Sequence, residues 1–366
     1  MYAQELLYQI ALTQVPNIGD VSAKELLQCF ENASAIFKAP LRHLEKIEGI
    51  GTVRGRSIKN FHDFKRIEKE IRFLEKYRIT PLFYTSEKYP TRLRNCYDSP
   101  VMLYYKGNAD LNQARIIGLI GTRGNTPYGR EVTEQLVAAL VPHQVLIVSG
   151  LAYGIDILSH KAALKNKLPT VGVLAHGLDR IYPAVHKSIA AQMLENGGLL
   201  TDFMSATNPD KQNFPRRNRI VAGMTDATIV IESGIKGGSL ITAALANSYN
   251  RDVFAIPGRV NDNRSAGCNY LIKSNKAALI TGAADMVEMM GWEPKEITVP
   301  LQKELFTPLP EEEKALLALF REKEVLHIDE IRLQSKLSAS QIAAAVLNLE
   351  LQSLLKSLPG KMYRVI

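Results

Sequence analysis

Residues 115–127 read Arg-Ile-Ile-Gly-Leu-Ile-Gly-Thr-Arg-Gly-Asn-Thr-Pro, a short apolar run followed by a polar, glycine-bearing turn. The apolar run lacks two-residue alternation, which is typical of a strand buried on both faces of a sheet. Pro127 suits the first turn of a helix, because a proline there gives up no hydrogen bond. The stretch therefore predicts a strand, a tight turn and a helix, the beginning of a βαβ unit.

The same succession recurs through the middle of the chain. Short runs rich in Val, Ile and Leu alternate with amphipathic stretches, which indicates an α/β fold with a parallel sheet and helices on both faces. The predicted strands are 115–120, 145–148, 170–174, 199–202, 228–232, 253–256 and 278–281. The predicted helices are about 127–141, 154–166, 183–196, 215–224 and 239–250.

The first 80 residues instead predict short helices with an internal repeat. The stretches 15–24 and 47–56 align with Gly19 over Gly51, so each copy predicts a helix, a glycine hairpin and a second helix. Glycine amides at a helix N-terminus attract phosphate, but such hairpins also serve only to pack helices. A DNA contact and a structural role therefore both stay open. The basic residues near the second hairpin are Arg54, Arg56 and Lys59.

The C-terminal part begins after a proline-rich segment. Residues 292–310 hold four prolines and predict a linker. Three helical stretches and a hairpin at Pro359-Gly360 then predict a winged helix, with Ser338 or Ser340 capping its third helix. Its charge is balanced, so we expect a protein-contact or structural role rather than duplex reading. The predicted domains are 1–80, 81–291 and 311–366, with the linker at 292–310.

Composition limits the classes of partner. The 366 residues carry 45 basic and 37 acidic side chains, a net charge of +8 that favours an anionic partner such as nucleic acid. The sequence has no apolar run of about 18 residues and no basic N-terminal region, so we expect no membrane insertion and no signal peptide. The three cysteines lie far apart, which excludes a disulfide framework and predicts a cytoplasmic protein.

Glycine-bearing turns follow several of the predicted strands. The carboxyl ends of parallel strands meet at one edge of a sheet, where ligands of α/β folds bind. Backbone amides in such turns hold phosphate, although each is also an ordinary strand-to-helix turn. None matches GxGxxG or the Walker A order, so dinucleotide binding and ATP hydrolysis are not favoured. The candidate ligand-binding residues of these turns are Gly121, Thr122, Arg123, Ser149, Gly150, Lys236, Gly237, Gly238 and Ser239.

The strongest local excess of positive charge lies at residues 211–219, KQNFPRRNR, with one aromatic residue and no acid. A base can stack on Phe214, a contact worth about 1–3 kcal/mol, so this mixture favours single-stranded nucleic acid over duplex. Arg216 and Arg219 share a helix face, and Arg219 is expected to tie the helix to the sheet through an internal salt bridge. The candidate DNA contacts of this segment are Lys211, Asn213, Phe214, Arg216 and Arg217.

Five motifs together resemble one family over about residues 85–300. They are IGTR (120–123), SGLAYGID (149–156), NFPRRNRIVAGM (213–224), ESGIKGGSLITA (232–243) and AIPGRV (255–260). In this order they resemble the DNA-processing protein A (DprA/Smf) family, whose flanking helix-hairpin-helix (SAM-like) and winged-helix modules the two ends of the chain also resemble.

The resemblance implies an extended Rossmann-like domain that binds and protects incoming single-stranded DNA. It further implies a homodimer that loads the RecA recombinase onto this DNA during natural transformation. In this sequence it implies that Arg123, Lys211 and Phe214 lie in the DNA pocket. The backbone of residues 149–150 and 213–217 is implied to lie nearby.

An alternative of a different class is a Rossmann-like nucleotide-processing hydrolase of the lysine-decarboxylase-like type. That group places a catalytic glutamate after a GG-x-x-T loop, whereas Gly237-Gly238-Ser239 here runs into Thr242 without a carboxylate. Glu232 could serve only by a different geometry. His160 has no companion at ligand spacing and is expected to be structural. We therefore predict a binding protein rather than an enzyme, with no metal and no cofactor.

Overall fold

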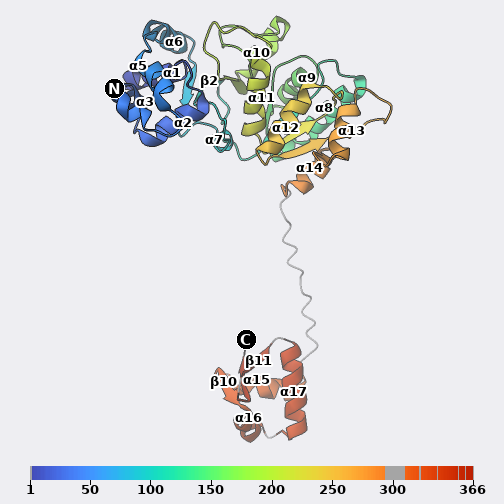
Figure 1. The fold of residues 1–366 in the computed structure, drawn as a ribbon. Coiled ribbons are helices and arrows are strands. Elements are labelled where there is room, and N and C mark those ends of the chain that lie inside the picture. The colour runs from blue at the N-terminus through green and yellow to red at the C-terminus, as the bar shows by residue number, and fades with distance from the viewer. Residues whose placement is uncertain are drawn as a thin grey trace. The chain divides into compact units, whose positions relative to one another are not determined.

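The computed structural model describes residues 2–292, 310–320, 323–335, 337–352, 354–358 and 360–365. The chain divides into two compact units between Trp292 and Glu293 (Figure 1). The first unit contains the predicted helical and α/β parts, and the second contains the predicted winged helix. Residues 293–309 of the predicted linker lie outside the described residues.

A nine-stranded sheet forms the centre of the first unit. Its strands are β1 (Thr80–Phe83), β2 (Met102–Gly107), β3 (Ile116–Ile120), β4 (Leu146–Ser149), β5 (Thr170–Val173), β6 (Gly197–Thr201), β7 (Ala227–Val230), β8 (Asp252–Ala255) and β9 (Ala278–Leu279). The order across the sheet is β1-β2-β6-β5-β4-β3-β7-β8-β9. From β6 to β9 all neighbours are parallel, which confirms the predicted fold class. The sequence missed β1 and β2, which extend the sheet in antiparallel pairing.

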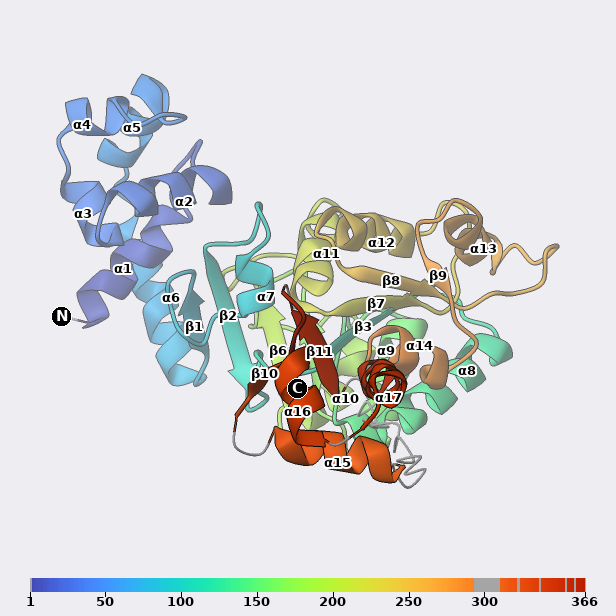
Figure 2. The same ribbon diagram turned by 90° about the horizontal axis from the view of Figure 1, so that it is seen from below.

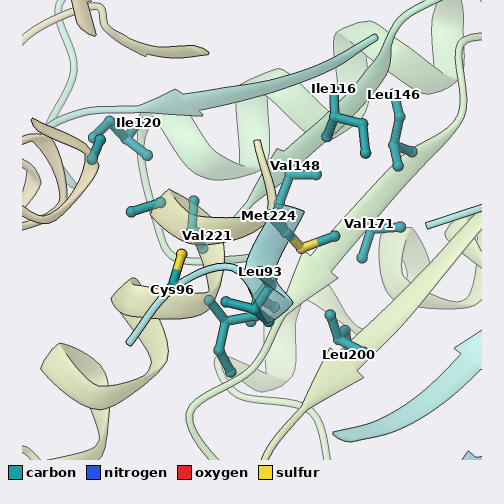
Figure 3. Close-up of a cluster of buried hydrophobic side chains, with 14 of the residues drawn as sticks. Leu93, Cys96, Ile116, Ile120, Leu146, Val148, Val171, Leu200, Val221 and Met224 are labelled. Carbon is teal, nitrogen blue, oxygen red and sulfur yellow. The ribbon is translucent and has the colours of Figure 1, made fainter. Parts of the chain in front are cut away.

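Helices pack on both faces of this sheet. They are α8 (Pro127–Ala139), α9 (Ile155–Lys165), α10 (Lys187–Met193), α11 (Asn213–Met224), α12 (Gly238–Ser248), α13 (Ala266–Lys273) and α14 (Ala283–Met289). Successive strand residues point to opposite faces. Ile116 of β3 packs with Val221 and Met224 of α11 on one face (Figure 3). Leu119 belongs to the core on the other face, under α8, α9 and α14.

The N-terminal helices pack on the antiparallel end of the sheet (Figure 2). They are α1 (Tyr2–Leu12), α2 (Asp20–Cys29), α3 (Ala33–Lys38), α4 (Leu41–Glu45), α5 (Gly51–Lys59) and α6 (Phe64–Lys76), and the short α7 (Thr91–Arg94) follows β1. The two predicted hairpins join α1 to α2 and α4 to α5. Met102 and Tyr104 of β2 lie in the same apolar core as Ile10 and Leu26. This core therefore continues across residue 80, and the domain boundary placed there stays a prediction.

A buried ion network also joins the N-terminal helices to the α/β part. Arg219 Nη2 lies 2.9 Å from Asp202 Oδ2, just beyond β6, and 2.9 Å from Asp20 Oδ2 at the start of α2. The other oxygen of Asp20 accepts a hydrogen bond from the backbone amide of Val101 at 3.0 Å. The internal salt bridge predicted for Arg219 is thus confirmed, and it connects three parts of the fold.

The second unit is a winged helix, as predicted. Its elements are α15 (Glu311–Leu319), β10 (Val325–His327), α16 (Ile328–Ser335), α17 (Ala339–Leu351), β11 (Leu355–Leu358) and β12 (Met362–Val365). The strands pair antiparallel in the order β10-β12-β11. Ser338, one of the two candidates, caps α17 in a capping box with Gln341. Leu316, Ile331 and Leu349 belong to a core that this unit does not share with the first.

Candidate functional site

The glycine-bearing turns after β3, β4 and β7 lie at one edge of the sheet, which we call the carboxyl edge. Strand β3 is central there, because β4 pairs with it on one side and β7 on the other. The chain order reverses between β3 and β7, so this is the switch point at which many α/β folds bind a ligand.

Glu232 occupies this switch point. Its side chain is buried, and its carboxylate accepts hydrogen bonds from the backbone amide of Thr126 at 2.9 Å and from the Thr126 hydroxyl. Thr126 in turn caps α8 through the amide of Gly129 at 3.1 Å. The carboxylate of Glu232 therefore holds the start of α8, and protein atoms fill the position that a dinucleotide would take.

A pocket opens on the other side of β3, beyond the ends of β4 and β5. Its cavity measures about 40 Å³, room for a few waters, so a nucleobase would lie at its mouth rather than inside it. It gathers residues from four segments that are distant in sequence. They are Arg123, Gly150, Ala152, Tyr153, Leu174, Ala175, His176, Tyr182, Pro183, Phe214 and Arg217.

Arg123 and Phe214 lie side by side in this pocket, as the resemblance implied. The guanidinium carbon of Arg123 is 5.4 Å from the centroid of the Phe214 ring. The ring of Tyr182 approaches Phe214 on another side, with centroids 6.4 Å apart and planes tilted by 54°. An exposed cation beside aromatic faces can bind a phosphate and a stacked base at the same place.

The sequence analysis missed Tyr153 and Tyr182, which also line the pocket and are about half exposed. Tyr153 stands within the SGLAYGID motif, so its position between two turn glycines was a usable signal. Tyr182 lies in a loop with no helical or strand pattern, and only the folded chain brings it to Phe214.

Lys211 and Arg216 face solvent, one before and one after the pocket residue Phe214 in the sequence. Lys211 is exposed just before α11. The side chain of Arg216 is 58% exposed, with its guanidinium 5.1 Å from the Phe203 ring and 3.9 Å from Asp202. Arg123 is thus the exposed cation that lines the pocket, and Arg216 lies on the side of α11 that faces Asp202.

Arg217 departs from the prediction, because its side chain is buried. Its guanidinium donates to the backbone carbonyls of Gly150 and Val173, beneath the pocket. Burial lowers the pKa of Arg217, and the nearby Asp156 partly opposes this. The predicted phosphate contact of this side chain is therefore corrected: one turn of α11 points Arg216 outward and Arg217 inward, where it supports the β4 turn.

The side chains of Ser149 and Asn213 are also turned inward. Ser149 Oγ donates to the carbonyl of Leu119 at 2.6 Å, and Asn213 Nδ2 donates to the carbonyl of Asn208 at 3.0 Å. Gly150 packs directly on Arg217, since a Cβ at this position would lie 2.7 Å from its guanidinium. Gly150 thus lines the pocket through its backbone, and the side chains of Ser149 and Asn213 are buried in the fold.

The other predicted contacts lie in the turns that follow β3 and β7. Gly121 and Thr122 are half-buried, and the Thr122 amide donates to the carbonyl of Glu232 at 2.7 Å. In the β7 turn, Lys236 and Gly238 are exposed and Gly237 is half-buried, whereas Ser239 is buried with its hydroxyl on Ser233. The candidate residues therefore form two groups, one at the pocket and one at the β7 turn.

The basic residues of the second N-terminal hairpin are mostly engaged in the fold. Arg54 donates to the carbonyl of Asn17 at 3.1 Å, and Lys59 donates to those of Phe37 and Ala39 at 2.8 and 2.9 Å. Arg56 and Lys59 are exposed and Arg54 is half-buried. These contacts favour the structural role over the DNA contact, the two alternatives that the sequence left open.

His160 is a core residue, as expected. Its Nδ1 lies 2.7 Å from Thr170 Oγ1, and burial lowers its pKa to about 3, so the ring is neutral. Within the described ranges, no three His, Cys, Asp or Glu side chains cluster as metal ligands would. None of the helices described is long and apolar enough to cross a membrane.

Known proteins resemble the chain in both units. Residues 80–291 match the model of a family described as DNA recombination-mediator protein A, and residues 304–361 match that of the DprA winged helix domain. Protein Smf of Synechocystis is 32% identical over the whole of both chains. DNA processing protein DprA of Bacillus subtilis is 40% identical over 59% of this chain and 74% of its own length.

Solved structures of known proteins also resemble the chain. The crystal structure of DNA processing protein A from Streptococcus pneumoniae matches with a TM-score of 0.68 and 32% identity, over 77% of this chain and 97% of that one. The Helicobacter pylori protein of the same name, whose structure is described as showing a single-stranded DNA binding mode, matches with a TM-score of 0.54. It is 30% identical over 59% of this chain and 96% of its own.

Proposed function

Because the chain belongs to the DNA recombination-mediator protein A family, we propose that it binds single-stranded DNA in the pocket at the ends of β4 and β5. The observation that carries this proposal is the pairing of the Arg123 guanidinium with the Phe214 ring at 5.4 Å. Arg123, Lys211 and Arg216 would bind the phosphates. Phe214 would stack on one base at the pocket mouth, where any base has a suitable face.

The filled switch point supports binding without catalysis. The carboxylate of Glu232 accepts two hydrogen bonds from Thr126 and is buried, so it is not free to act on a nucleotide. His160 is enclosed in the core and neutral. The hydrolase alternative thus has no acid or base at the pocket mouth among the residues that sequence reasoning offered.

Family membership supports the wider role. In this proposal the protein forms a homodimer in the cytoplasm, protects incoming single strands during natural transformation, and loads the RecA recombinase onto them. Light scattering of the purified protein tests the dimer. Assembly of RecA filaments on strands coated by a single-strand-binding protein, with and without this chain, tests the loading.

Fluorescence anisotropy of labelled oligothymidylate, titrated with the full chain, tests the central proposal. We expect binding that survives competition by duplex DNA of matched length and weakens steeply with salt, because phosphate contacts release counterions. If the strand does not bind at low salt and the chain instead hydrolyses nucleoside monophosphates, the hydrolase alternative replaces this proposal.

A further inference from the structure

A loop at the same edge of the sheet has no part in the pocket. Residues 257–265 connect β8 to α13 and project beyond the neighbouring helices (Figures 1 and 2). We call this segment the β8 loop. It follows a parallel strand, so it starts at the carboxyl edge, on the side of β3 opposite to the pocket.

Hydrogen bonds at both ends hold the β8 loop in place. The Tyr128 hydroxyl donates to the carbonyl of Pro257 at 3.1 Å, and the Asn269 side chain exchanges two hydrogen bonds with the backbone of Gly258 at 3.2 and 3.1 Å. Asp262 closes the loop by accepting from the amide of Arg264 and the hydroxyl of Ser265. A loop that is ordered before binding loses less entropy when a ligand binds.

The charges that the β8 loop presents to solvent are positive. Arg259 and Arg264 are exposed, while the carboxylate of Asp262, its one acid, is used within the loop. Among the described residues, the Arg259 side chain forms no ion pair. The β7 turn, which carries the exposed Lys236, adjoins the end of the loop through a hydrogen bond from the Gly267 amide to the carbonyl of Ser233 at 2.7 Å.

Arg264 connects the loop to the pocket side. Its guanidinium donates to the carbonyl of Gly124, the residue after Arg123. A Cβ on Gly124 would lie 2.7 Å from the same guanidinium, so the contact is close. Arg264 therefore links the turn that carries Arg123 to the β8 loop, which also carries Arg259.

We propose that the β8 loop continues the path of single-stranded DNA beyond the pocket, with Arg259 and Arg264 on phosphates of nucleotides that flank the one stacked on Phe214. The proposal rests on the proposed function, and it adds a second anion-binding segment to the same site. Lys236 of the adjoining β7 turn would lie beside the same path, which gives this predicted contact outside the pocket a role.

The dependence of binding affinity on the length of the DNA strand tests this path. Anisotropy titrations use the full chain with oligothymidylates of about 6 and about 20 nucleotides, near the lower end of usual site sizes and beyond their upper end. The double variant Arg259→Ala/Arg264→Ala should weaken binding of the long strand about fivefold per arginine at low salt, the scale of an exposed ion pair. It should also reduce the salt slope by about 0.7 per lost contact, and leave the short strand unchanged.

Two further variants make the test specific. Lys161→Ala/Lys165→Ala removes the same charge from exposed positions on α9, whose last residue Lys165 lies away from the carboxyl edge, and should bind both strands like the unchanged chain. Phe214→Ala should weaken both strands. Thermal melting of each variant confirms that the fold is intact.

The outcomes separate the two proposals. If Phe214→Ala weakens both strands but the loop variant binds the long one normally, the β8 loop lies off the DNA path and the proposed function stands. The same conclusion follows if the lysine control loses as much affinity as the loop variant. If the unchanged chain binds neither strand, the proposed function itself fails. Normal DNA binding with impaired recombinase loading would assign the loop to a protein partner and overturn its place on the DNA path.

Discussion

Helix α11 carries three arginines in different surroundings. Arg217 and Arg219 are held by carbonyls and carboxylates within the fold, while Arg216, which lies near Asp202 like Arg219, is 58% exposed. All three lie within four residues of sequence. The contrast teaches that a basic run does not by itself mark a ligand site, because the phase of the helix decides which cations remain available.

The largest expected effect lies at Arg219. Arg219→Ala removes the close partner of the buried Asp202 and leaves it only the exposed Arg216 at 3.9 Å, so we expect the free energy of unfolding to fall by about 3–5 kcal/mol. Urea denaturation measures it. Arg216→Ala, one turn away and exposed, should cost less than about 1 kcal/mol. Equal losses for the two variants would break the distinction between the enclosed and the exposed arginines.

Phe214→Ala tests the aromatic part of the pocket. We expect the affinity for single-stranded DNA to fall by about 1–3 kcal/mol, because one stacked base is lost. The salt slope should stay nearly unchanged, since no charge is removed. A large change in slope would mean that the variant displaces Arg123, whose guanidinium packs on this ring.

The solvent-facing cations should behave in the opposite way. Arg123→Ala and Lys211→Ala should each weaken binding across sequences and reduce the salt slope by about 0.7 per phosphate contact on single strands. Their stability in urea should match that of the unchanged chain. An unchanged slope would remove the residue concerned from the DNA path; Lys165→Ala is the control for charge alone.

The smallest effect is expected from the winged helix. It has its own core and balanced charge, so a chain that lacks residues 305–366 should bind single-stranded DNA within a few fold of the full chain. Anisotropy with both chains measures this. A large loss would show that this unit contributes to DNA affinity despite its neutrality.

Sequence reasoning found the parallel strands because they are short apolar runs, several of them followed by a glycine turn, as at Ile116–Ile120 and Gly121. It missed β2, since the burial of Met102 and Tyr104 comes from helices far away in sequence. The family motifs placed Arg123 and Phe214 in one pocket, and in the structure the Arg123 guanidinium lies 5.4 Å from the Phe214 ring. It could not find Tyr182, nor see that Arg217 is buried, because both facts depend on packing between distant segments.

The shared core around β2 also has a consequence for how the protein is made. Helices α1 to α6 leave the ribosome before β2, the strand whose apolar face they cover, and N-terminal parts generally fold first during synthesis. When β2 emerges, the helices that pack on its apolar face have therefore already folded. A chain begun at residue 81 would leave Val101, Met102 and Tyr104 in water, and we expect it to aggregate rather than to yield a working minimal domain.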